Sequence, residues 1–242
     1  MYIDRKWIFL MMGIFLISGI VGMSQQKLLA LVLTIPGLLI AITFHEFAHA
    51  FAADKLGDDT PKRQGRLTLN PIRHLDPVGS VLLLFAGFGW GRPVEINPRN
   101  FNRNISMQKG EAIVSVAGPL MNILLAFVFT IIYFFVYKFA PQSFFVSTPG
   151  VVVMLLLQTT IFTNIGLGIF NLIPLPPLDG SKIFMSFLPY NARNWIMNHE
   201  QVFYIVFLVI WIFGLAGYII SPVIDAVSSG IFWLVSILFG FI

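Results

Sequence analysis

The chain has 242 residues, of which 57% are hydrophobic and only 11% are charged, and its formal net charge is +4. A soluble domain of this length cannot cover so much apolar surface, so the composition excludes an ordinary soluble protein and predicts one that works within the membrane. The sequence contains no cysteine, which excludes disulfides, thiolate metal sites and cysteine nucleophiles.

Six apolar stretches are long enough to cross a bilayer as helices, which takes about 20 residues each. In chain order they cover residues 7–23, 28–51, 112–139, 150–173, 202–220 and 223–242. We therefore expect an all-α polytopic membrane protein with about six transmembrane helices, folded as a single integral-membrane domain over residues 1–242. The first stretch is longer than the apolar core of a usual signal peptide, so we expect it to be retained as a span.

A long connection, polar and basic at its start, separates the second and third predicted spans. It contains a short apolar piece, Gly79 to Trp90, which cannot cross the membrane by itself. The glycines of this piece disfavour a stable helix. We expect a short membrane-associated β-hairpin here, covered by other parts of the protein so that its backbone polar groups are satisfied.

The basic residues are distributed very unevenly if the N-terminus is placed in the cytoplasm and the chain crosses six times. Only Lys27 and Lys138 then fall on the far side. The other thirteen fall on the cytoplasmic side: Arg5, Lys6, Lys55, Lys62, Arg63, Arg66, Arg73, Arg92, Arg99, Arg103, Lys109, Lys182 and Arg193. By the positive-inside rule, this predicts a multi-pass protein of the cell membrane with both termini in the cytoplasm.

The second predicted span contains the sequence FHEFAHA, residues 44–50. His45 and His49 are four residues apart and share one face of a helix, so two imidazoles can hold one zinc ion. Glu46 follows the first histidine and can reach a water on that zinc, the arrangement found in metalloproteases. Ionisable side chains are costly within a membrane span and are functional by default. The alternative is a polar cluster that packs helices together without a metal.

A catalytic zinc site needs a third protein ligand, and Asp179 is the candidate. It lies in FNLIPLPPLDGSKI, where three prolines force the chain to unwind after the fourth span. The charge-based topology places this carboxylate and the histidine motif at similar depths on the cytoplasmic side. Two alternatives stay open: Asp179 as an ordinary turn residue before a glycine, and His74 as the third ligand.

Taken together, these motifs resemble the site-2 proteases, which are intramembrane zinc metalloproteases. HEFAH and LDG carry the resemblance, along with GRLTLNPIRHLDPVGS, RPVEINPRNF, VAGPLMN and FNLIPLPPLDG, over roughly residues 36–190. They match the compact bacterial and archaeal branch, since no segment has room for a PDZ or CBS domain. We expect a catalytic core at about 28–190, with peripheral helices at 7–23, 202–220 and 223–242.

The resemblance implies a role for each matching residue. His45, His49 and Asp179 match the ligands of one zinc ion, and Glu46 matches the catalytic base. Asn171 matches an asparagine that stabilises negative charge on the scissile carbonyl, although it can equally be a helix-end cap. Asn122 matches a substrate-positioning asparagine, with Gly118 and Pro119 serving either this motif or a kink of the third span.

The expected activity is that of an intramembrane endopeptidase in regulated intramembrane proteolysis. It would cleave peptide bonds within or beside the transmembrane segments of single-pass membrane proteins, near the cytoplasmic side. An extended substrate would add to the edge of the expected hairpin. The expected partners are these substrates and the lipid bilayer, with no nucleic acid. Two rival functions are a metal transporter, which would hold its site near the midplane, and a non-catalytic scaffold, which would need no metal.

Overall fold

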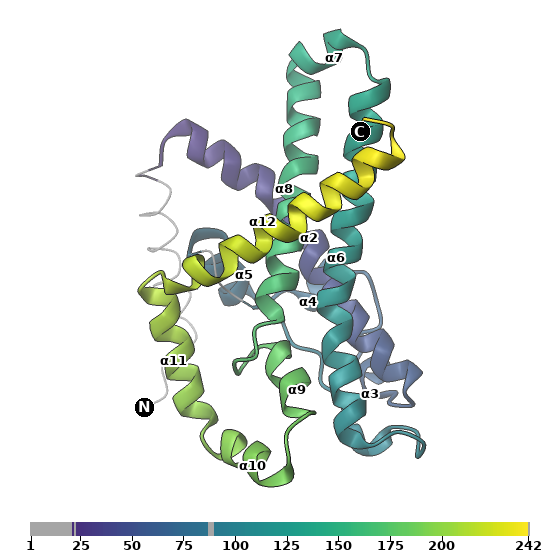
Figure 1. The fold of residues 1–242 in the computed structure, drawn as a ribbon, viewed down its shortest axis with the longest axis vertical. Helices are drawn as coiled ribbons and strands as arrows, with labels where there is room; N and C mark the ends of the chain where they lie inside the picture. Colours follow the sequence, from purple (N-terminus) through teal and green to yellow (C-terminus); the bar gives the residue numbers. More distant parts are fainter. Residues whose placement is uncertain (1–20, 22, 87–89, 242) are drawn as a thin grey trace.

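The computed structural model describes residues 21, 23–86 and 90–241, and these residues are almost entirely helical (Figure 1). Four of the described helices are long and apolar enough to cross a membrane: α2 (Gln25–Lys55), α6 (Met107–Phe139), α8 (Thr148–Asn171) and α12 (Leu215–Leu238). The predicted all-α, multi-pass class is confirmed. The first predicted span, residues 7–23, lies almost wholly outside the described residues.

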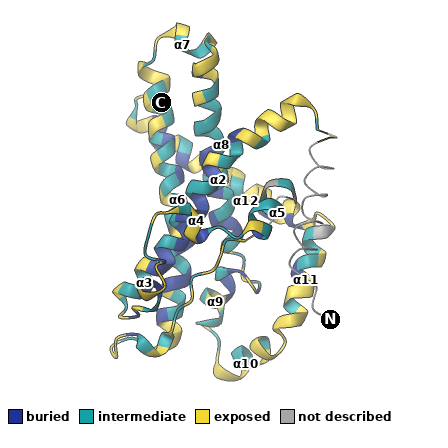
Figure 2. Ribbon diagram, turned by 180° about the vertical axis from the view of Figure 1, so that it is seen from behind, coloured by how far each residue is buried: buried dark blue, intermediate teal, exposed yellow. Residues whose placement is uncertain are grey.

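Helices α2, α6 and α8 form the centre of the molecule and pack extensively on one another. Figure 2 shows the buried residues concentrated where these three helices meet. Small residues permit this close approach. A side chain at Gly37 of α2 would meet the Cα atom of Thr160 in α8 at 2.8 Å, and one at Gly168 would meet the Pro119 carbonyl oxygen of α6 at 3.1 Å. The packing therefore fixes the relative positions of the three helices.

The connection between α2 and α6 contains short helices and extended backbone. After α2 come α3 (Thr60–Arg63) and α4 (Pro71–His74), and the 3₁₀ helix η1 (Pro98–Asn100) precedes α6. The buried carboxylate of Asp58 accepts hydrogen bonds from the Thr60 main chain and hydroxyl, from the Asn97 main chain and from the Asn100 amide. This carboxylate therefore ties both ends of the connection to the end of α2.

The expected β-hairpin is replaced in part by helix α5 (Pro77–Ala86). Gly79 lies inside α5, near its first turn. The other glycines on which the prediction of a non-helical piece rested come after the last residue of α5. Among the described residues there is no strand, only an isolated antiparallel bridge between Leu75 and Gly91. The expectation that this piece is non-helical is therefore wrong for residues 77–86, and a segment without regular secondary structure, residues 92–97, follows it.

The chain turns back twice around the ends of α8. The short helix α7 (Gln142–Val146) joins α6 to α8 at one end of the bundle (Figure 1). At the other end the proline-rich segment unwinds, as predicted, before α9 (Asp179–Met185) and α10 (Tyr190–Asn198). A side chain at Gly180 would overlap the carbonyl oxygens of Leu172 and Ile173, so glycine lets the start of α9 lie against the end of α8.

The C-terminal part differs from the expected pair of spans. Helix α11 (Glu200–Ile212) has 13 residues, about 20 Å of helix, and a turn at Gly214 with φ of +69° separates it from α12. The prediction placed this turn near Ser221 and Pro222, but Pro222 lies inside α12. A fifth span over residues 202–220 is therefore wrong, because the left-handed glycine, rather than the proline, breaks the helix.

The end of α12 lies beside the end of α6. The Lys138 ammonium donates to the Phe239 carbonyl oxygen and lies 5.7 Å from the centre of the Phe241 ring. Figure 1 shows this C-terminal end near α7, at the opposite end of the bundle from α3, α9 and α10. The prediction that both termini lie in the cytoplasm stays a prediction, although α12 ends at the opposite end of the bundle from the basic loops.

Candidate metal centre

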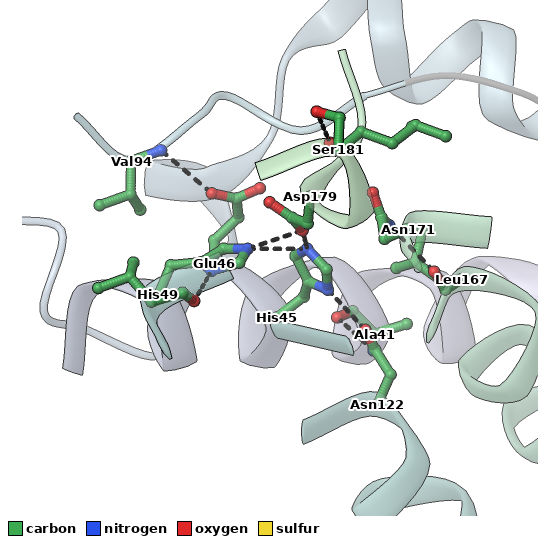
Figure 3. A network of polar contacts seen from close by, with 12 residues as sticks. Ala41, His45, Glu46, His49, Val94, Asn122, Leu167, Asn171, Asp179 and Ser181 are labelled. Atoms are coloured by element: carbon green, nitrogen blue, oxygen red, sulfur yellow. Dashed lines mark hydrogen bonds and ion pairs between the residues drawn. The ribbon is translucent and has the colours of Figure 1, made fainter. Parts of the chain in front are cut away.

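Three ligand atoms converge where Asp179, the first residue of α9, faces His45 and His49 of α2 (Figure 3). The Nε2 atoms of His45 and His49 are 3.0 Å apart, and each lies 3.1 Å from Oδ2 of Asp179. The structure thus brings together the three residues that the sequence selected from two distant segments. His74, the alternative third ligand, hydrogen-bonds instead to the Thr68 carbonyl oxygen and lies outside this group.

The other ring nitrogen of each histidine faces an acceptor. Nδ1 of His49 donates to the Val114 carbonyl oxygen over 2.7 Å, and Nδ1 of His45 donates to Oδ1 of Asn122 over 2.7 Å. Because these acceptors hold the ring hydrogen on Nδ1, the Nε2 lone pairs point toward Asp179. Both imidazoles are buried, at 5% and 8% exposure, so their ring orientations are fixed by packing as well.

The donor set fits a divalent metal ion. Two imidazole lone pairs and a carboxylate oxygen directed at one point repel each other unless a cation lies between them. Tetrahedral ligands at the usual zinc distances of about 2.0–2.1 Å are about 3.3 Å from one another, and the three atoms here are separated by 3.0–3.1 Å. Two histidines and one carboxylate, with an open fourth position, is the ligand set of a catalytic zinc site.

Gly118 of α6 makes the room that the two imidazoles occupy. A side chain there would come within 2.5 Å of His49 Nε2 and 2.7 Å of His45 Cε1. Val114, Gly118 and Asn122 are spaced by four residues and so form one face of α6 against the histidines. Sequence analysis connected Gly118 only with a motif or a kink. The i, i+4 spacing of Gly118 and Asn122 was the available signal for a face packed on the site.

Glu46 lies beside the metal centre and lines the same cavity. Its Oε2 atom accepts a hydrogen bond from the Val94 N–H over 3.2 Å, which ties the carboxylate to segment 92–97. The approach is close: a side chain at Gly91 would lie 3.3 Å from Oε1 of Glu46 and 3.0 Å from Ile42. Val94 and Gly91 were not identified from the sequence, because contacts of a loop leave no periodic pattern.

The cavity has a volume of about 550 Å³, and most of its wall is apolar. Asn171 lines it from the last residue of α8, while the amide donates to the Leu167 carbonyl oxygen one turn earlier. Asn122, in contrast, is fully buried behind His45 and does not line the cavity. Other wall residues come from α5, the segment after it, α6, α9 and α11, and include Leu82, Leu83, Trp90, Pro93, Ile96, Ser115, Lys182, Tyr204, Phe207 and Leu208.

The helical bundle and its buried histidine–carboxylate group define the class of a membrane-embedded zinc metalloprotease. Consistent with this class, the family model described as "Peptidase family M50" matches residues 33–214. The chain belongs to peptidase family M50, and its resemblance to the site-2 proteases is confirmed. Its cofactor is zinc, and members of this family act on membrane-protein substrates in the bilayer.

Individual relatives agree with the family assignment. The chain is 40% identical to "Putative zinc metalloprotease YwhC" of Bacillus subtilis, over 84% of this chain and 90% of that protein. It is 29% identical to "Putative zinc metalloprotease Rip2" of Mycolicibacterium smegmatis, over 75% and 67% of the two chains. A Methanocaldococcus jannaschii protein, "Putative zinc metalloprotease MJ0611", is 24% identical over 86% and 96%. No solved structure matches the chain.

Proposed function

We propose that this protein hydrolyses peptide bonds within or beside the transmembrane segments of single-pass membrane proteins, using one zinc ion held by His45, His49 and Asp179. The observation that carries the proposal is the convergence of these three ligand atoms next to Glu46 in a largely apolar cavity. Family membership supports the metalloprotease activity. The substrate class and the individual residue roles are our inference from the geometry.

Each residue of the site has a defined task in this reaction. Zinc, when bound, supplies a water whose pKa is lowered toward about 7 and polarises the scissile carbonyl. Glu46 accepts a proton from the attacking water and passes it to the leaving amine, while the Val94 N–H holds one of its oxygens in place. The Asn171 amide, which lines the cavity, donates to the negative charge that develops on the carbonyl oxygen.

The substrate must unwind to be cut, because a helix buries its own carbonyls and amides in internal hydrogen bonds. Segment 92–97, which has no regular secondary structure, lines the cavity with Pro93, Val94 and Ile96, and an unwound substrate segment could pair with its main-chain groups. This single segment takes over the task expected of the hairpin. Asn122 lies out of contact with the cavity, so its effect on substrate position is indirect, through the His45 ring.

The end of the bundle that carries α3, α9 and α10 faces the cytoplasm in our proposal. Most of the described basic residues lie on the loops and helix ends of that region, and the metal centre lies toward it. The whole chain acts as one membrane domain, with α11 and α12 at its periphery. Because the chain has no cysteine, single cysteines introduced at Ser147 and Asn198 can map the topology. Membrane-impermeant thiol reagents should label them from opposite sides, and labelling from the same side would contradict this orientation.

Cleavage of a model single-pass substrate by the Glu46→Gln variant tests the function. We expect the rate to fall by at least about a hundredfold with the zinc content unchanged, because the glutamine cannot take up the proton. Asp59→Asn is the matched control, since this carboxylate is exposed and pairs with Arg63 at 2.7 Å. Undiminished cleavage by Glu46→Gln would exclude the proposed role of this residue.

A further inference from the structure

Two buried amides form a chain behind His45 that links three helices. Asn122 of α6 accepts a hydrogen bond from His45 Nδ1 on α2 through its Oδ1 atom. Its Nδ2 atom donates to the Ala41 carbonyl oxygen and to Oδ1 of Asn164 on α8, both over 3.0 Å. Nδ2 of Asn164 then donates to the Thr160 carbonyl oxygen over 2.9 Å. Both asparagine side chains are completely buried.

The direction of this chain is set by two main-chain carbonyls, which can only accept. The Thr160 carbonyl requires the amino group of Asn164, so Oδ1 of Asn164 must face Asn122. The amino group of Asn122 then has to point at Asn164 and at the Ala41 carbonyl, which leaves Oδ1 of Asn122 for His45. Only a ring with its hydrogen on Nδ1 satisfies that oxygen, so Nε2 of His45 carries the lone pair.

The two histidines reach the same tautomer by different routes. His49 is set directly by a main-chain carbonyl, that of Val114, which cannot be replaced by mutating a side chain. His45 is set by side chains, and its nearest partner is an amide that could present either an oxygen or an amino group. If Asn122 were turned over, its amino group would demand a hydrogen on Nε2 of His45, which would block metal binding at that atom.

We propose that Asn164, acting through Asn122, is a positioning residue that keeps His45 in the zinc-binding tautomer. The proposal rests on the proposed function and adds a role for Asn164. Neither residue contacts the cavity, and every polar atom of the two amides has a partner, as burial in a membrane span requires. A polar link that merely joins α2, α6 and α8 would not need a defined direction, whereas here each of the two amides is oriented by a main-chain carbonyl that accepts from it.

Zinc affinity measured by chelator competition tests the linkage. Asn122→Ala should weaken zinc binding about 10- to 100-fold, the usual effect of removing a partner behind a ligand histidine. Asn164→Ala should weaken it less, about three- to tenfold, because the Ala41 carbonyl still favours the correct orientation of Asn122. Thr130→Val is the control: this buried α6 hydroxyl donates to the Ala126 carbonyl oxygen of its own helix, and its loss should leave zinc affinity unchanged.

The double variant separates positioning from a general loss of packing. If Asn164 acts through Asn122, then adding Asn164→Ala to Asn122→Ala should cause no further loss of zinc affinity. Independent, multiplying effects of the two substitutions would overturn the proposal. The proposal would also be overturned if Thr130→Val weakened zinc binding as much as Asn164→Ala does.

The tautomer itself can be read from nitrogen NMR of the metal-free protein with ¹⁵N-labelled histidine. We expect His45 to carry its hydrogen on Nδ1 in the natural chain and to become a mixture of both tautomers in Asn164→Ala, with His49 unchanged. An Nε2-protonated His45 in the natural chain would overturn the proposal. This measurement does not depend on catalysis, so it stands apart from the test of protease activity with Glu46→Gln.

Discussion

The metal centre and the cavity wall that faces it are built in opposite ways. At the metal centre, His45 and His49 of α2 are buried against α6, and each ring nitrogen has a hydrogen-bond partner. On the facing wall, Trp90 and Tyr204 are 44% and 42% exposed. The difference teaches that helix packing fixes the proposed ligands independently of any substrate, whereas the exposed side chains of the wall are less restrained by packing.

The strongest test of the tightly packed metal centre is to fill the space beside the two histidines that Gly118 leaves open. In Gly118→Ala the new methyl group would press on both imidazoles, at 2.5 Å from His49 Nε2 and 2.7 Å from His45 Cε1. Since the packed helices cannot easily separate, the rings must move, and a shift of about 1 Å can lower a rate by about a hundredfold. We expect proteolysis to fall by about that factor or more, with a parallel loss of bound zinc.

Gly166→Ala on α8 is the matched control for this substitution. A methyl group at Gly166 meets only Ile224, at 3.9 Å, so the same chemical change should leave zinc content and cleavage unaltered. Normal zinc binding by Gly118→Ala would show that the centre is as adaptable as the wall.

Asp58 anchors the segment that forms part of the wall, so Asp58→Asn should loosen that segment. The asparagine keeps a single acceptor oxygen for the four hydrogen bonds that the carboxylate receives. We expect the free energy of unfolding to fall by about 2 kcal/mol at pH 7, measured by thermal or chemical unfolding in detergent. Asp59→Asn, at an exposed neighbour, should change it by less than about 1 kcal/mol.

The acid dependence of the same substitution gives a second readout. Burial raises the pKa of the Asp58 carboxyl, but hydrogen bonds from Thr60, Asn97 and Asn100 outweigh it and hold the pKa below the ordinary value. A depressed pKa in the folded state means that the stabilisation is complete above about pH 4–5 and is lost as the pH falls through the lowered pKa. The stability difference between the natural chain and Asp58→Asn should therefore shrink in acid. A difference that stays constant down to pH 3 would contradict the role of the ionised carboxylate.

Tyr204→Ala probes the exposed cavity wall and should have the smallest effect on activity of these substitutions. The side chain lines the cavity from α11, and no zinc ligand depends on it. We expect zinc affinity to stay the same and kcat/KM to change by about two- to fivefold, in a direction that varies with the size of the substrate side chains, because only cavity contacts are lost. A loss of zinc from this variant would show that wall and centre are coupled.

Some of the site could be predicted because local spacing or charge reports it. The i, i+4 spacing of the histidines and the adjacent Glu46 predict one polar face of a helix. The distribution of basic residues predicted a topology in which Asp179 lies at the same membrane depth as these residues. The three prolines before Asp179 correctly indicated where α8 ends, since a proline cannot continue a helix. Residue spacing and proline positions are local, and basic residues can be counted along the chain, so one sequence is enough to predict these features.

Other features depend on which faces of the helices pack against each other, and this packing cannot be predicted from one sequence. Asn164 looks like any polar residue of a span until α8 is placed against α6. Gly214 and the Ser221–Pro222 pair are both credible helix breaks, and only the structure shows that the chain turns at Gly214 while Pro222 lies inside α12. The same applies to α5, whose N-terminal proline and apolar residues form a helix that accommodates Gly79 and ends before the later glycines.

Zinc-edge X-ray absorption of the purified protein tests the central claim most directly. We predict one zinc per chain, with two imidazole nitrogens and at least one carboxylate oxygen at about 2.0–2.1 Å. Asp179→Ala should lose the carboxylate signal, and His45→Ala should lose one imidazole together with most of the metal. A zinc shell that is unchanged in Asp179→Ala, or that contains more than two imidazoles, would contradict the ligand set on which this account rests.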